Sequence, residues 1–224
     1  MIKNEKLSSL EVTPKETAEK CVIWLHGLGA DGNDFASIVP ELHLPQTLNI
    51  KFIFPHAPVM PVTINDGYQM RAWFDIAHHD ISADVDHDGI TKSITAINNL
   101  IENEQNAGID PSNIMLAGFS QGAVIALMTG MLYPKRLAGI IALSGLLPHA
   151  EAVTQQRSTA NRDIPIFIGH GSEDQMVSVA LGKAAYDVLS QASYPATWHT
   201  YPMAHSVCPD EIRDISKWMQ NIWK

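Results

Sequence analysis

Cysteine is scarce in this chain of 224 residues, where only Cys21 and Cys208 are present. Two thiols in a chain of this length do not form the disulfide framework of a small secreted domain. No apolar run reaches the length of a membrane-spanning helix, and the N-terminus begins with polar residues rather than with a secretory signal. These absences predict a reducing, cytoplasmic location.

Basic residues are also few, since 15 Lys and Arg stand against 24 Asp and Glu, giving a formal net charge of −9. Charge alone therefore argues against nucleic acid as a partner. The glycine-rich motifs that bind nucleotides, G-x-G-x-x-G and G-x-x-x-x-G-K-[ST], are missing as well.

A metal site is not predicted either. The segment 84–89 has the D-x-D-x-D-G pattern that opens a calcium loop, but the twelfth position is Thr95, which has no carboxylate. Acidic residues at a polar helix start explain that segment better. The segment 78–80 (HHD) contains possible ligands and is more simply a solvated loop.

Short apolar runs alternate with amphipathic segments along the whole chain, without repeats or linkers, which predicts a single domain over residues 1–224. Four amphipathic segments have apolar residues on one helical face, around 90–101, 124–131, 184–188 and 212–222. Alternation of buried strands and helices predicts an α/β fold, with a mostly parallel central sheet flanked by helices. The apolar runs expected as strands are 21–25, 50–54, 114–117, 137–143, 164–168 and 196–201.

The pentapeptide Gly118-Phe119-Ser120-Gln121-Gly122 has the G-x-S-x-G pattern. It directly follows an expected strand and precedes an expected helix, which is the setting of a nucleophile elbow in α/β-hydrolases. The sharp turn excludes side chains two residues on either side of the serine, hence the glycines. Ser120 is the predicted nucleophile, and the alternative is a serine that only caps the helix.

In this fold the acid and then the histidine follow the serine along the chain. His205 lies in the turn after the last expected strand, where the base should be. His149 comes too early, His170 lies at the end of a strand where the acid-bearing turn begins, and His199 lies within a strand. Glu173 and Asp174 both follow the fifth expected strand. The residues alone favour Asp174 without excluding Glu173, and Asp174 is also a plausible cap for a helix beginning near Val177.

Six motifs occur in the order typical of the carboxylesterase, lysophospholipase and acyl-protein thioesterase family, which the chain therefore resembles from about Cys21 to its last helix. They are LHGLGADGNDF, FPHAP, WFD (73–75), GFSQGA, HGSEDQMV and AHSV. The resemblance implies an α/β-hydrolase fold, a triad of Ser120, Asp174 and His205, and an oxyanion hole formed by the N–H groups of Leu28 and Gln121. It further implies hydrolysis of acyl esters or thioesters without a metal or organic cofactor.

The segment 59–76 contains apolar residues without a clear period. Met60, Ile64, Trp73 and Phe74 are candidates for an acyl pocket, or for a lid at about 59–80 that touches lipid or a membrane surface. Ordinary core and loop packing is the alternative. An exposed apolar loop here also allows a homodimer.

Two other interpretations compete with the esterase. A catalytically silent binding protein can have the same fold, although it does not need an intact triad. A peptidase or a carbon–carbon hydrolase can use the same triad, because fold and triad do not fix the bond that is cleaved.

Overall fold

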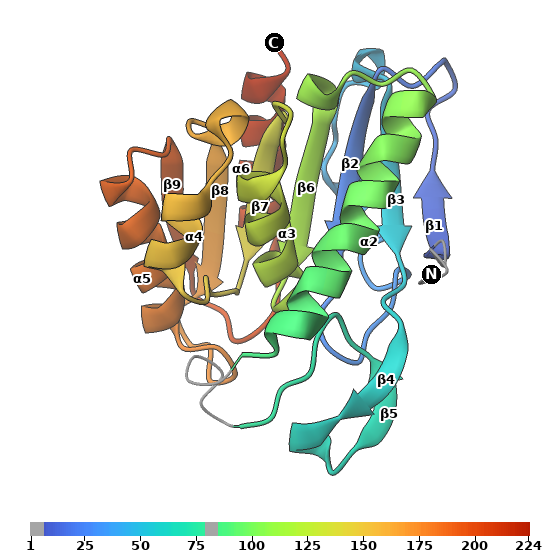
Figure 1. Ribbon diagram of the computed structural model, residues 1–224. Coiled ribbons are helices and arrows are strands. Elements are labelled where there is room, and N and C mark those ends of the chain that lie inside the picture. The colour runs from blue at the N-terminus through green and yellow to red at the C-terminus, as the bar shows by residue number, and fades with distance from the viewer. Residues whose placement is uncertain (1–6, 79–84) are drawn as a thin grey trace.

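The computed structural model describes residues 7–78 and 85–224. The N-terminal residues 1–6, positions 79–80 of the expected lid and Asp84 of the calcium-like pattern lie outside this range. The central sheet contains β1 (Ser9–Val12), β2 (Lys20–Leu25), β3 (Ile50–Pro55), β6 (Ile114–Phe119), β7 (Gly139–Leu143), β8 (Ile166–Gly171) and β9 (Ala196–Tyr201). Its order is β1-β3-β2-β6-β7-β8-β9, and every pair is parallel except β1 with β3 (Figure 1).

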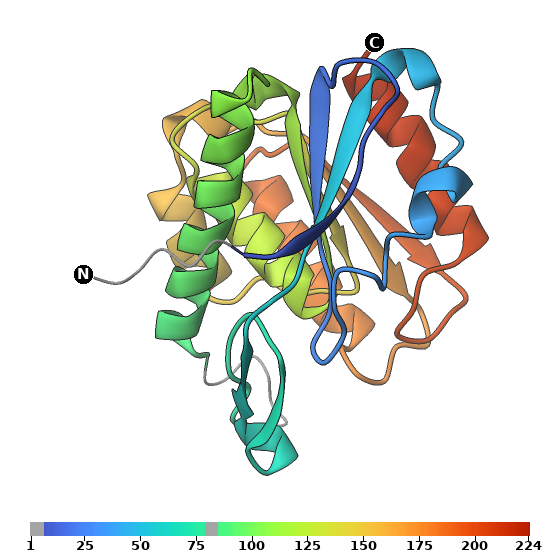
Figure 2. The same cartoon turned by 90° about the vertical axis from the view of Figure 1, so that its right-hand side faces the viewer.

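Helices cover both faces of the sheet. They are α1 (Ile38–Glu41), α2 (His87–Asn106), α3 (Gln121–Leu132), α4 (Ala150–Gln156), α5 (Val179–Gln191) and α6 (Pro209–Ile222). Four short 3-10 helices connect these elements, at Gln46–Leu48, Thr63–Asn65, Pro111–Asn113 and Thr159–Asn161. Figure 2 shows α2 and α6 on opposite sides of the sheet. Helices α2 to α5 share one core cluster with the sheet, and α1 and α6 share the other.

Strand β2 shows why the buried strands appear as continuous apolar runs. Val22 and Trp24 point into the core under α1 and α6, whereas Cys21, Ile23 and Leu25 point into the core under α2 and α3. Successive side chains of a strand alternate between faces, so a strand covered on both sides is apolar throughout. The predicted fold class is confirmed.

The predicted strands and helices are all present, and two of the strands begin two residues later than predicted. The fourth expected strand begins at Gly139 rather than Leu137, because the Leu137 N–H is bound by the Asn161 side chain. The fifth begins at Ile166 rather than Ile164, whose N–H bonds within the preceding turn.

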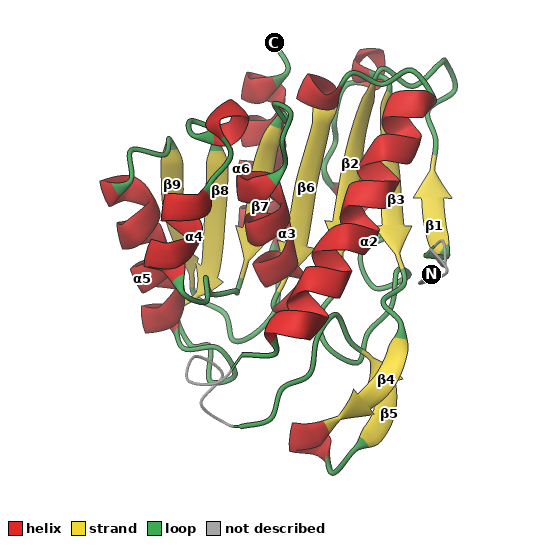
Figure 3. Ribbon diagram, viewed as in Figure 1, coloured by secondary structure: helices red, strands yellow, loops and turns green. Residues whose placement is uncertain are grey.

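Some elements were not predicted from the sequence, namely β1, α1, α4 and a separate hairpin of β4 (Val59–Val62) and β5 (Tyr68–Arg71). Strand β1 is a half-exposed edge, and α4 buries only Val153, so neither has a strong apolar pattern. The hairpin extends beyond the carboxyl ends of the parallel strands (Figures 1 and 3). Among the helices of the described residues, none has the length and apolar character needed to span a membrane.

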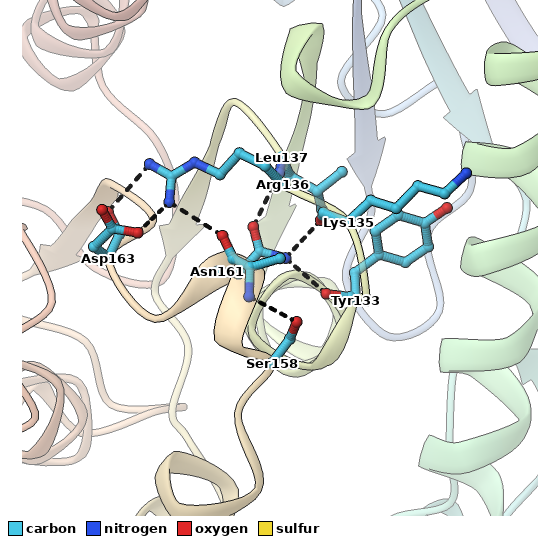
Figure 4. Close-up of polar contacts among 8 residues, drawn as sticks. Tyr133, Lys135, Arg136, Leu137, Ser158, Asn161 and Asp163 are labelled. Carbon is cyan, nitrogen blue, oxygen red and sulfur yellow. Dashed lines mark hydrogen bonds and ion pairs between the residues drawn. The ribbon is translucent and has the colours of Figure 1, made fainter.

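The loop that follows α3 is held by a buried amide (Figure 4). Asn161 Nδ2 donates to the carbonyl oxygens of Tyr133 and Lys135, both at 2.8 Å, and Asn161 Oδ1 accepts the Leu137 N–H at 2.9 Å. Asn161 is fully buried, so this one side chain satisfies three backbone groups. Arg136 and Asp163 form an ion pair nearby at the surface.

We expect Asn161→Ala to lower the free energy of unfolding by about 3 kcal/mol, because backbone groups lose their partners in the interior. Urea denaturation measures this change. Asn103→Ala, an exposed amide on α2, is the matched control and should cost less than about 0.5 kcal/mol. Equal effects of the two substitutions would refute the role given to Asn161.

Glu211, in the first turn of α6, is buried without a partner. Neither carboxyl oxygen receives a hydrogen bond from a described residue. A Cβ atom at Gly169 of β8 would lie 2.1 Å from Oε1, so the carboxyl group occupies space that only glycine leaves open. Burial raises the pKa of Glu211 from 4.5 to about 8, so the group is protonated at neutral pH.

Glu211 should make the protein less stable as the pH rises from 4.5 to about 8. In this window the unfolded chain has released the proton that the folded chain retains, so the free energy of unfolding falls with pH. We expect Glu211→Gln to reduce this slope, as measured by denaturation at several pH values. Glu102→Gln, at an exposed position of α2, should leave the slope unchanged.

Candidate active site

Ser120 lies at a strained bend between β6 and α3. Its φ of 55° and ψ of −119° are unfavourable for a residue with a side chain, and its N–H donates to the Leu143 carbonyl at 2.8 Å. A Cβ atom at Gly118 would lie 2.2 Å from the Gly122 carbonyl oxygen, and one at Gly122 would lie 2.4 Å from that of Leu25. Both glycines are required by close backbone approach, as the pentapeptide predicts.

The Ser120 hydroxyl does not cap α3. Ser120 occupies the N-cap position, but its side chain makes no capping hydrogen bond. The alternative interpretation, in which Ser120 only caps the helix, therefore has no capping hydrogen bond to support it.

Asp174 and His205 are hydrogen-bonded, although they are separated by β9. The distance from His205 Nδ1 to Asp174 Oδ2 is 2.6 Å, and the Asp174 side chain is fully buried. The His205 ring also packs against Phe119, with ring centroids 4.7 Å apart. Glu173 is exposed, so the structure separates the two neighbouring acids that the residues alone left open.

The other oxygen of Asp174 is bound by its own turn. Asp174 Oδ1 accepts the N–H groups of Met176 and Val177, each at 2.9 Å. Helix α5 begins later, at Val179, and is capped by Ser178. The expectation that Asp174 caps this helix was therefore wrong, because Asp174 closes the turn before it.

A cavity of about 880 Å³ lies over this bend. Ser120, His205, Leu28, Gln121, Ile64 and Phe74 are among the predicted site residues that line it. Met60 and Trp73 are not among the lining residues, and Trp73 is almost completely buried beneath the cavity-side loops. Two other histidines after Ser120 do not line the cavity, since His149 stacks on His87 and His199 stacks on Phe167.

Several lining residues outside the segment 59–76 were not found from the sequence, including Val124 of α3, Leu146 and Met176. They come from different parts of the chain and share no spacing. Only the fold brings them together, so no local pattern signals them.

The loop that carries Leu28 is fixed by buried hydrogen bonds. Trp73 Nε1 donates to the His26 carbonyl at 2.9 Å, and His26 Nε2 accepts the Ala57 N–H at 3.0 Å. An acceptor at Nε2 places the ring proton on Nδ1, which faces the Gly27 carbonyl at 2.7 Å. Burial lowers the pKa of His26, so the ring is neutral and serves as a rigid spacer.

Gln121 joins α3 to the segment after the hairpin. Its side chain accepts the Trp73 N–H at 2.8 Å and donates to the Phe74 carbonyl at 2.7 Å. The next residues of that segment bind the hairpin, because Asp75 accepts the Thr63 N–H at 2.7 Å and the Ile76 carbonyl accepts the Ile64 N–H at 2.8 Å.

The N–H groups of Leu28 and Gln121 have no acceptor within the described part of the chain. Leu28 follows the buried Gly27, and Gln121 is the first residue of α3, where N–H groups lack helical partners. Both residues line the cavity beside Ser120. Two N–H donors and the positive end of a helix dipole suit a developing oxyanion.

No group of three His, Cys, Asp or Glu side chains within residues 7–78 and 85–224 has the arrangement of a metal site. In the calcium-like segment, Asp86 is instead the N-cap of α2 and accepts the Gly89 N–H at 2.9 Å. This is the helix-start role expected from the sequence.

The sequence matches the phospholipase/carboxylesterase family over residues 9–223. It is 36% identical to acyl-protein thioesterase 1 of Yarrowia lipolytica over 217 residues, covering 95% of this chain and 96% of that protein. It is 32% identical to carboxylesterase SOBER1 of Arabidopsis thaliana over 206 residues, covering 91% of this chain and 90% of that protein.

Solved structures show the same fold. The crystal structure of Arabidopsis thaliana SOBER1 has a TM-score of 0.87 at 31% identity, over 92% of this chain and 100% of that one. The crystal structure of Zea mays acyl-protein thioesterase 2 has a TM-score of 0.84 at 29% identity, over 97% of this chain and 99% of that one. The fold, the arrangement of the cavity and these matches agree, and the chain belongs to the phospholipase/carboxylesterase family of α/β-hydrolases.

Proposed function

We propose that this protein is a serine hydrolase that cleaves acyl esters and acyl thioesters. Ser120 is the nucleophile, His205 is the general base and Asp174 orients the base. The observation that carries the proposal is the 2.6 Å bond from His205 Nδ1 to Asp174 Oδ2, beside a cavity that Ser120 and His205 both line. The names of the relatives, acyl-protein thioesterase and carboxylesterase, support this substrate class.

The reaction begins with proton transfer from the Ser120 hydroxyl. Because Nδ1 of His205 is bound to Asp174, Nε2 is the nitrogen that takes this proton as Oγ attacks the acyl carbonyl. Asp174 fixes that tautomer and stabilises the imidazolium. His205 then protonates the leaving alcohol or thiol, and a water molecule repeats the two steps on the acyl-enzyme to release the acid.

The negative charge that develops on the acyl oxygen needs donors that are already in place. We assign this role to the N–H groups of Leu28 and Gln121, each worth about 3 kcal/mol in the transition state. Because the loop and the helix are fixed before substrate binds, little reorganisation is needed during the reaction.

Replacing Ser120 by Ala should reduce kcat/KM for a p-nitrophenyl ester by about a millionfold, because the nucleophile is lost. A fluorophosphonate probe should label the wild type and not this variant. Ser206→Ala is the control, since Ser206 is exposed and lies beside His205 without lining the cavity. Its activity and labelling should match the wild type.

The same experiment separates the competing functions. A silent binding protein would be neither labelled nor active. A hydrolase of another bond class would be labelled at Ser120 and yet turn over neither esters nor thioesters. Retained esterase activity in Ser120→Ala would contradict the assignment of the nucleophile.

The hairpin β4–β5 is proposed as the lid of an acyl site within a single domain. Ile64 and Met70 line the cavity from the hairpin, together with Val124 of α3 and Leu146, which follows β7. Apolar walls of this kind hold an acyl chain by burying its surface, and methionine adapts to different lengths.

We expect Ile64→Ala to lower kcat/KM for long-chain esters about fivefold to thirtyfold relative to acetyl esters, because apolar contact with the chain is lost. A series of p-nitrophenyl esters measures the ratio. Val59→Ala is the control, because Val59 lies on the same hairpin but outside the cavity wall. An unchanged ratio in Ile64→Ala would show that the hairpin does not hold the acyl chain.

Among the described residues, the large apolar side chains that are exposed lie on the hairpin and in the cavity wall. Val59 and Tyr68 of the hairpin are 58% and 70% exposed, and the lining residue Met176 is 75% exposed. They support the proposal of transient contact with a lipid surface, and equally of a homodimer across the hairpin.

Both cysteines are free, which supports the proposed cytoplasmic location.

A further inference from the structure

A second histidine lies behind the Asp174 carboxylate. His170, the fifth residue of β8, is fully buried. Its Nε2 is 2.8 Å from the Val177 carbonyl oxygen and 3.4 Å from Asp174 Oδ2, the oxygen that also bonds to His205. One carboxylate oxygen therefore faces two imidazole rings.

The partners of His170 determine its tautomer. A carbonyl oxygen can only accept, so Nε2 carries the proton and donates it to Val177. Nδ1 has no partner among the described residues. Burial lowers the pKa of His170, so the ring is neutral and adds no positive charge beside Asp174.

Helix α5 leaves space for this ring at Gly182. A Cβ atom there would lie 2.3 Å from His170 Nδ1. Glycine in a helix interior costs about 1 kcal/mol relative to alanine, and the close approach of the imidazole accounts for its presence.

We propose that His170 is a positioning residue for the Asp174–His205 pair, acting through the turn of residues 174–177. This inference rests on the proposed function. His170 holds the Val177 carbonyl, and the N–H groups of Met176 and Val177 hold Asp174 Oδ1. With Oδ1 fixed in this way, Oδ2 is directed at His205.

The neutral state of His170 matters to the proposed reaction. His205 becomes positively charged when it takes the Ser120 proton, and Asp174 must stabilise that charge. A charged ring beside the same oxygen would compete with His205 for the carboxylate, whereas a neutral ring bonded to the Val177 carbonyl adds no such charge. The titratable groups that face His170 are Asp174 and His205.

The test compares His170→Leu, His170→Gln and His170→Asn by kcat, KM and pH profile. The leucine variant removes the donor, and kcat should fall about tenfold to a hundredfold with KM unchanged, as loss of supporting hydrogen bonds does at other sites. In the leucine variant, the acid limb of the pH profile of kcat/KM should move to lower pH, because a displaced Asp174 stabilises the His205 imidazolium less. The low-field proton signal of the His205 Nδ1–H should shift or broaden.

The amide variants distinguish positioning from packing. A glutamine N–H reaches the place of Nε2 and should restore much of kcat and the wild-type acid limb, whereas the shorter asparagine should not. Gly182→Ala should resemble His170→Leu by displacing the ring, although alanine favours the helix. Ile168→Val, two residues earlier on the same face of β8, is the control and should leave the acid limb unchanged.

Gly182→Ala serves as the test if His170→Leu does not fold. The proposal is overturned if Gln and Asn are equally slow and both keep the wild-type acid limb, or if Gly182→Ala matches the wild type. An active Ser120→Ala variant is a separate result, which contradicts the proposed triad rather than the role of His170.

Discussion

The backbone contact between the bend at Ser120 and the end of β2 determines the rest of the site. This contact requires Gly122, because a Cβ atom there would meet the Leu25 carbonyl oxygen. The bend itself requires Gly118, where a Cβ atom would meet the Gly122 carbonyl oxygen. The contact brings the first turn of α3 against the loop that follows Leu25, and residues of both, Gln121 and Leu28, line the cavity. The strain at Ser120 is offset by burial, since most of α3 is inside the protein and anchors the bend from behind.

A second feature is the use of uncharged side chains to hold charged or reactive ones. His26 is kept neutral by burial and spaces the loop of Leu28, and Gln121 ties the start of α3 to residues 73 and 74. His170 lies behind Asp174 and, as another neutral side chain, bonds to the Val177 carbonyl. Neutral hydrogen-bonding groups fix geometry without altering the charge balance on which proton transfer depends.

The sequence predicts most of this arrangement where local rules apply. Buried parallel strands, the G-x-S-x-G bend and the order of acid and base all follow from short patterns, and the motifs in order imply the family. Asp174 and Glu173 were not separable from local pattern, because adjacent residues differ only in which one the fold turns inward. The strands of the hairpin and the part of the cavity wall outside the motifs and the segment 59–76 were not predicted, since exposed strands and residues from distant loops have no common period.

Residues 71–76 are attached on both of their sides. Gln121 fastens Trp73 and Phe74 to the body of the enzyme, and on the other side Asp75 and Ile76 bind the 3-10 turn at the hairpin tip. The first attachment is buried, whereas Thr63 is exposed and its partner Asp75 is partly exposed. The tip of the hairpin is thus held by hydrogen bonds near the surface, each worth about 1 kcal/mol. Breaking these bonds would free the hairpin tip from residues 75 and 76, while the buried bonds of Gln121 would still hold residues 73 and 74 against the start of α3.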